Sequence, residues 1–91
     1  MNPKKVNILG MELDEIKFAS CTAHFGIGPN FATLYDIESK EEGMGHATGL
    51  LKEAKSYYKG QGKKFGGAVA LNNRMRSLYN KLNIKEYDKE D

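Results

Sequence analysis

The chain has 91 residues, of which 40% are hydrophobic and 29% are charged, and its formal net charge is +2. We expect a single globular domain over 1–91, because this length leaves no room for a second core, with a frayed tail at 88–91. No apolar run is long enough for a transmembrane helix, so we expect no membrane contact. The first residues lack the apolar stretch of a signal peptide, and a single cysteine cannot form an internal disulfide, so we expect a cytoplasmic protein.

The charge is distributed unevenly along the chain. Residues 1–45 contain four Lys and seven acidic residues, a balance of −3, whereas 46–91 contain ten Lys and Arg and five acidic residues, a balance of +5. A basic half suits a phosphate-bearing ligand, but a solvated basic helix face gives the same pattern. Cys21, His24 and His46 lack the paired spacing of zinc ligands, so we predict no metal site.

The first forty residues predict an antiparallel meander of three strands. A short apolar run at 6–9 is followed by a loosely alternating segment at 16–25 and by an aromatic and β-branched segment at 31–38. The residues between the last two segments include glycine, proline and asparagine, which are typical of a turn.

The hydrophobic period then changes from two to between three and four, which indicates helices. Gly60 and Gly62 are expected to end the first helix. The elements predicted here are a helix at 47–58, a strand at 64–71, a helix that Asn72 or Asn73 caps and that runs to 82, and a strand at 84–87. The order β-β-β-α-β-α-β predicts an α+β fold, a mixed sheet with helices packed on it.

A glycine-containing segment at 42–47 lies between the third predicted strand and the first helix. Glycines there would expose the first amides of the helix, at the positive end of its dipole, where a pyrophosphate binds well. An ordinary turn gives the same pattern. The third glycine of the dinucleotide fingerprint and the Gly-Lys-Ser or Gly-Lys-Thr of the Walker motif are both missing.

Two stretches of the second half carry a recognisable spacing. The segment Glu42-Gly43-Met44-Gly45-His46-Ala47-Thr48-Gly49-Leu50-Leu51 places small residues before a Leu pair, and Asn72 precedes Tyr79 by seven residues. In these motifs the chain from Asp36 to Tyr87 resembles the GNAT family of N-acetyltransferases. Compact versions of this fold resemble small phage or mobile-element proteins.

The resemblance implies acetyl-CoA as the cofactor. Its pantetheine arm would pair with the backbone around Tyr35 to Glu38, and its pyrophosphate would take the amides of 43–48. Tyr79 would protonate the leaving thiolate, although a core aromatic residue would also occupy this position. The cofactor-binding residues implied by the resemblance are Tyr35, Ile37, Glu42, Gly43, Met44, Gly45, His46, Ala47, Thr48, Asn72 and Tyr79.

An acceptor amine must lose a proton before it attacks. The candidate general bases are Glu38, which we favour, Asp36 on the same strand face, and His24 at the end of the preceding strand. Each could instead be a solvated side chain. Neither Ser20 nor Cys21 has a base nearby in the sequence, so we expect no covalent acyl-enzyme.

The chain departs from the family mildly at Asn83-Ile84, which replaces the usual Gly-Phe, and in two more important ways. Glu42 replaces the usual Arg or Gln, and there is no room for the first strand and two helices that wall the acceptor site. The site would therefore be open to a large acceptor, a lysine of a protein partner, or be completed by a second subunit. The alternatives are a degenerate fold that binds a protein without catalysis and a nucleic-acid module using Tyr57 and Tyr58, which is less expected because both lie on the apolar stripe.

The missing elements also predict an uncovered surface on the meander. Phe18, Phe25 and Phe31 have few neighbours in the sequence to cover them, and an open sheet edge invites pairing. We therefore expect a two-fold homodimer through the meander. The competing expectation is a monomer that keeps this surface for a protein target.

Overall fold

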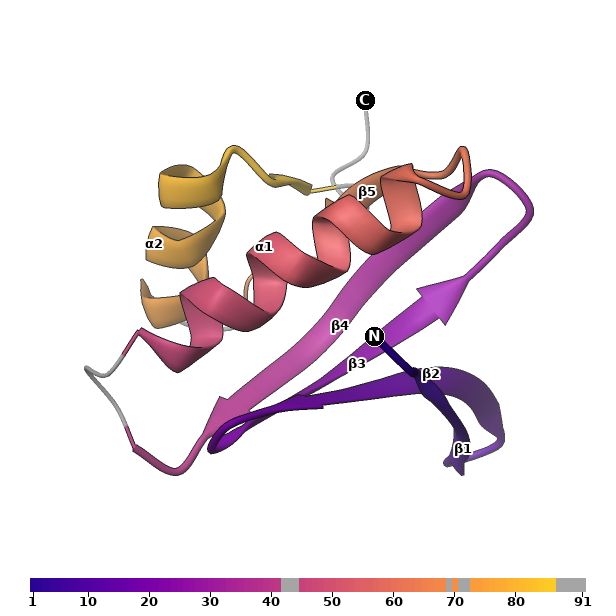
Figure 1. The fold of residues 1–91 in the computed structure, drawn as a ribbon, viewed down its shortest axis with the longest axis horizontal. Coiled ribbons are helices and arrows are strands. Elements are labelled where there is room, and N and C mark those ends of the chain that lie inside the picture. The colour runs from indigo at the N-terminus through magenta and orange to yellow at the C-terminus, as the bar shows by residue number, and fades with distance from the viewer. Residues whose placement is uncertain (42–44, 69, 71–72, 87–91) are drawn as a thin grey trace.

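The protein is an α+β structure with a six-stranded mixed sheet and two helices, seen in a computed structural model that describes residues 1–41, 45–68, 70 and 73–86 (Figure 1). The strands lie in the sheet in chain order. The elements are β1 (Lys4–Ile8), β2 (Met11–Phe18), β3 (Cys21–Ile27), β4 (Phe31–Ser39), α1 (His46–Lys59), β5 (Lys64–Gly67), α2 (Asn73–Leu82) and β6 (Lys85–Glu86). Neither helix has the length and apolar character needed to cross a bilayer.

The predicted meander is present, but it contains four strands rather than three. Strands β1 to β4 pair antiparallel in succession. The prediction of one strand over 16–25 was wrong, because Ala19 and Ser20 form a two-residue turn between Phe18 and its partner Cys21. Ala19 adopts a left-handed backbone there, with φ 54°. Alanine and serine are weak turn signals, so the alternating pattern continues through the reversal without a visible break.

Both helices lie on the same face of the sheet. Strands β4, β5 and β6 are parallel neighbours, with α1 in the first connection and α2 in the second. Successive right-handed crossovers in one direction place both helices on one side. Figure 1 shows α1 and α2 above the sheet, and in the described part of the chain no helix covers the opposite face. We call this opposite side the helix-free face.

The core fills the space between the sheet and the helices. At its centre the ring of Phe25 lies 5.4 Å from that of Tyr58 and 5.7 Å from that of Phe65, measured between centroids. The expectation that Phe25 is uncovered was therefore wrong, because its side chain points to the helix face and is fully buried. Phe18 and Phe31 remain 38% and 42% exposed. Tyr58 is buried, as its place on the apolar stripe predicts.

One carboxylate lies inside this apolar layer. Asp14 of β2 is only 8% exposed, and it accepts a hydrogen bond of 2.9 Å from the Tyr58 hydroxyl of α1. The ammonium group of Lys5 lies 3.3 Å from the other carboxylate oxygen. Burial, followed by the hydrogen bond and charge of Asp14, raises the pKa of Tyr58 far above its ordinary value, so the phenol stays a donor. This contact fixes α1 against the meander.

Replacing Tyr58 by Phe should lower the free energy of unfolding by about 1–3 kcal/mol, because a buried carboxylate oxygen loses its donor. Urea denaturation measures the effect. The matched control is Tyr57→Phe, since Tyr57 packs edge-on against Tyr58 and is less buried. Equal losses in the two variants would contradict a structural role for the Asp14 contact.

Candidate functional site

Strands β4 and β5 separate part of the way along β4. Their paired residues run from Phe31 with Lys64 to Leu34 with Gly67. A final hydrogen bond of 2.8 Å joins the Ala68 amide to the Leu34 carbonyl. Strand β4 continues to Ser39, so along 35–39 its edge has no β5 partner in the described chain. We call this divergence the fork.

A cavity of about 380 Å³ lies beside the fork, on the helix side. Its walls come from the end of β4, the first turn of α1 and one side of α2. A smaller cavity continues from it to Ile37 and Met75. The two cavities bring together five of the predicted site residues, Ile37, Gly45, His46, Ala47 and Thr48. They are also lined by residues that were not predicted: Ser39, Glu41, Arg74, Met75, Ser77, Leu78 and Lys81.

The first turn of α1 has the features of an anion site. Gly45 precedes the helix in a left-handed conformation, φ 77° and ψ 7°, which explains the glycine. Its N-cap residue, Gly45, makes no side-chain capping bond, and the first turn of the helix contains no acidic residue. Residues 45–48 line the cavity, so the first amides of α1, at the positive end of the helix dipole, lie at its wall.

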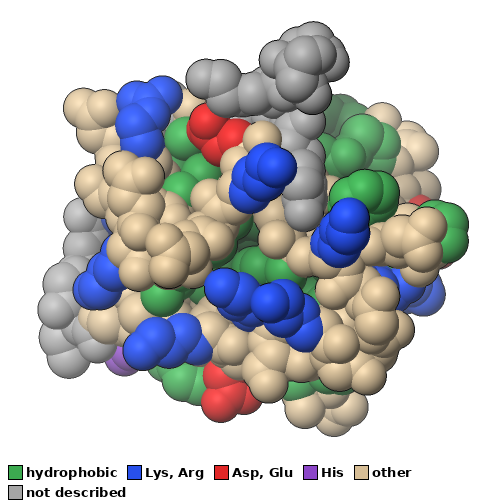
Figure 2. All heavy atoms as spheres, turned by 90° about the horizontal axis from the view of Figure 1, so that it is seen from above, with side chains coloured by type: hydrophobic (Ala, Val, Ile, Leu, Met, Phe, Trp, Pro, Cys, Tyr) green, Lys and Arg blue, Asp and Glu red, His purple; other side chains and the backbone are tan. Residues whose placement is uncertain are grey.

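The surface around the cavity is basic. Helices α1 and α2 together carry six Lys and Arg residues and one acid, Glu53. Figure 2 looks onto this side of the molecule and shows Lys and Arg side chains spread over it, with few acidic ones. Arg74 and Lys81 line the cavity itself. Neither residue was predicted from the sequence to line the site, although residues 74, 77, 78 and 81 share the helical spacing of three and four.

Tyr79 lies at the apex of the fork. It is only 3% exposed, and its hydroxyl donates a 2.7 Å hydrogen bond to the Ala68 carbonyl, where β5 ends. Its ring covers Gly67 so closely that any side chain at 67 would collide with it. Glycine at 67 is therefore required by the close approach of this ring. Tyr79 is part of the core, and its partner Ala68 is hydrogen-bonded to Leu34, the last residue of β4 that β5 pairs.

The predicted bases lie on the helix-free face, opposite Tyr79. His24 sits in the middle of β3, and not at its end as expected. Its Nδ1 is 2.8 Å from an Asp36 carboxylate oxygen, and its Nε2 is 3.0 Å from one of Glu15. These three residues are direct cross-strand neighbours in β2, β3 and β4. Glu38 is exposed further along β4, beside Thr22.

Two carboxylates determine the charge of His24. Burial on its own lowers the pKa of His24, but the hydrogen bonds and charges of Asp36 and Glu15 outweigh it, so the pKa is raised above the ordinary 6.5. Each ring nitrogen has one carboxylate partner, so the three groups form a charge-assisted bridge across the strands. Within the described residues no cluster of His, Cys, Asp and Glu is suited to a metal ion.

One further predicted residue in the described part of the chain, Tyr35, does not line the cavities beside the fork. Tyr35 lies on the helix-free face at a β-bulge, with its ring over Gly26. Four further residues predicted to bind the cofactor lie outside the described residues: Glu42, Gly43, Met44 and Asn72.

One contact could not be found from the sequence. The Ser20 hydroxyl is 2.8 Å from Nδ1 of His46, which is 26 positions away. The fold therefore gives Ser20 a neighbouring imidazole that its sequence neighbours do not supply.

Comparison of the chain with family models, with curated proteins and with solved structures finds no match. The site is therefore interpreted from its own geometry.

The His24 bridge predicts a pH-dependent stability. Because the pKa of His24 is raised in the folded state, its contribution is complete below pH 6.5 and is lost as the pH rises through the folded value. Urea unfolding of the wild type and of His24→Gln should differ most near pH 5.5 and progressively less toward pH 8.5. A constant difference over this range would contradict the charged bridge.

Proposed function

We propose that the protein is an acyl-CoA-dependent N-acetyltransferase that moves an acetyl group from acetyl-CoA to an amine, a lysine of a protein partner. The observation that carries this proposal is the fork, a strand edge that opens beside a helix start whose N-cap residue is glycine. An extended amide-containing chain can pair with such an edge as an added strand does. The pantetheine arm of coenzyme A has this chemistry, and bound acetyl-CoA supplies an activated thioester.

The surroundings of the fork suit the rest of the donor. The backbone of 35–39 offers N–H and C=O groups along an edge, and Ile37 gives an apolar wall toward α2. The amides of the first α1 turn would hold the pyrophosphate, and Arg74 and Lys81 would add positive charge at the cavity wall. The cytoplasmic location expected from the sequence is part of the same proposal.

The reaction requires an acid and a base. The Tyr79 hydroxyl lies at the apex of the fork, where a proton could pass to a leaving thiolate. Asp36 and His24 are bound to each other, so Glu38 is the candidate to take the proton from the acceptor amine. An acceptor would approach from the helix-free face, which no described helix covers.

A binding module without catalysis is the second candidate. One observation favours it: both ring nitrogens of His24 are held by carboxylates, so this imidazole is not free to accept a proton. Binding of acetyl-CoA without any turnover on peptide amines would identify this alternative.

Calorimetric titration with acetyl-CoA tests the loop assignment. Gly45→Glu should abolish binding, because it places a carboxylate where the pyrophosphate would lie. Gly62→Glu is the matched control. Both glycines have a positive φ, 77° at Gly45 and 81° at Gly62, and at neither would an added Cβ atom have a neighbour within 4 Å. The backbone cost of about 1–2 kcal/mol is then the same in both variants. If Gly45→Glu binds as tightly as Gly62→Glu, the phosphate site is wrong.

Turnover measurements test Tyr79. Tyr79→Phe keeps the ring over Gly67 and removes the hydroxyl, so the rate of thioester consumption with a lysine peptide should fall by roughly 10²–10⁴-fold. Tyr58→Phe also loses a buried hydroxyl, but one that lies at Asp14, and it serves as the control for lost stability. Equal rates in the Tyr79 variant and the wild type would leave Tyr79 with a structural role only.

A further inference from the structure

The tip of the β1–β2 hairpin presents an unusual leucine. Leu9 and Gly10 form its two-residue turn, with φ angles of 50° and 84°, the signs of a type I′ turn. Such turns favour Asn-Gly, because a bulky side chain in the left-handed region is strained. Leu9 nevertheless holds this position and is 99% exposed. In the isolated chain, leucine at this position is unfavourable in two respects, because its backbone is strained and its apolar side chain is exposed to water.

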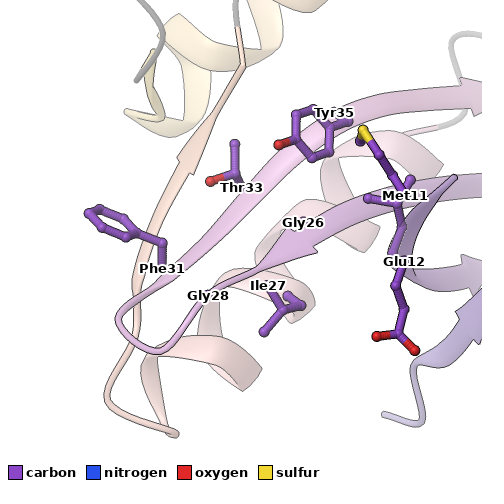
Figure 3. Close-up of a pocket in the computed structure, with 9 residues that line it drawn as sticks. Met11, Glu12, Gly26, Ile27, Gly28, Phe31, Thr33 and Tyr35 are labelled. Carbon is purple, nitrogen blue, oxygen red and sulfur yellow. The ribbon is translucent and has the colours of Figure 1, made fainter.

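A cavity large enough to admit an aliphatic side chain opens near this tip. It measures about 580 Å³ and lies on the helix-free face, between the start of β2 and the β3–β4 hairpin. Figure 3 shows Met11 and Tyr35 on one side of Gly26 and Gly28, with Thr33 and Phe31 along β4. Much of this lining is apolar and accessible, since Met11, Phe31 and Tyr35 are 45%, 42% and 39% exposed.

We propose that two copies of this chain form a two-fold dimer in which Leu9 of each copy inserts into the cavity of the other. The projecting residue and the cavity lie close together on one surface, because Met11, two residues after Leu9, lines the cavity. A surface that carries both parts of a contact is self-complementary under a two-fold axis. Both strained tips and both apolar cavities are then buried at once.

The charges around the tip favour a second copy over a strongly charged partner. Residues 4–18 contain three Lys and three acidic residues, so two such hairpins meet without net repulsion. A nucleic acid or a highly basic protein would gain no net attraction from this segment. The inference names the surface for the expected homodimer, and it does not depend on the acetyltransferase proposal.

Analytical ultracentrifugation between 1 and 200 μM tests the dimer through a matched pair of variants. The wild type should approach twice its 10.2 kDa, about 20 kDa, at the upper concentrations. Leu9→Asn suits the left-handed turn but removes the projecting side chain, so its dimer dissociation constant should rise at least about tenfold. Ala19→Asn is the control: Ala19 also has a positive φ, 54°, in an exposed turn, so this variant gains the same turn compatibility and should still dimerise.

A second variant blocks the cavity instead of removing Leu9. Thr33→Arg fills the cavity from the helix-free face and should also give a species near 10.2 kDa. A mixture of Leu9→Asn and Thr33→Arg should form more dimer than either alone, because one intact Leu9 meets one intact cavity. Wild type that stays monomeric throughout, Leu9→Asn that dimerises like Ala19→Asn, or a mixture without rescue would each overturn the proposal.

Discussion

The handedness of two chain crossovers determines the layout of this molecule. The connections from β4 to β5 and from β5 to β6 run in the same direction and turn the same way, so α1 and α2 share one face of the sheet. One apolar layer forms between the helices and the sheet, around Phe25, Tyr58 and Phe65. The Tyr58 hydrogen bond to Asp14 then holds this layer to the meander. The other face carries no helix in the described chain, and its side chains are available for other contacts.

This one-sided arrangement separates two kinds of chemistry. The start of α1 and the basic residues of α2 lie on the helix side, while the bridge of His24 with Glu15 and Asp36 lies on the opposite face. Only the fork connects the two sides, because there β4 has an edge without a partner strand in the described residues. A reaction between a phosphate-bearing donor and an acceptor on the open face would therefore take place at this divergence.

The sequence predicted those elements whose signals are local. The helical spacing of Leu50, Leu51, Ala54 and Tyr58 gave α1, and glycine after Lys59 ended it. The α+β class and the mixed sheet followed from the change of hydrophobic period. The Ala19–Ser20 turn was missed because its residues are weak turn signals. Contacts between distant segments could not be predicted either: Phe25 is buried by rings from α1 and β5, and His24 meets its carboxylates only through strand register. The basic wall of the cavity depends on how α2 packs, which its spacing alone does not fix.

The strand order has a consequence for how the protein acquires its structure. Because the six strands lie in the sheet in the order in which they are synthesised, each new strand finds its partner already present on the growing edge. The first four strands need only short hairpin loops to pair, so little loop entropy opposes them. The meander can therefore assemble as the chain leaves the ribosome, with the arrival of α1 closing the core and β5 and β6 added last.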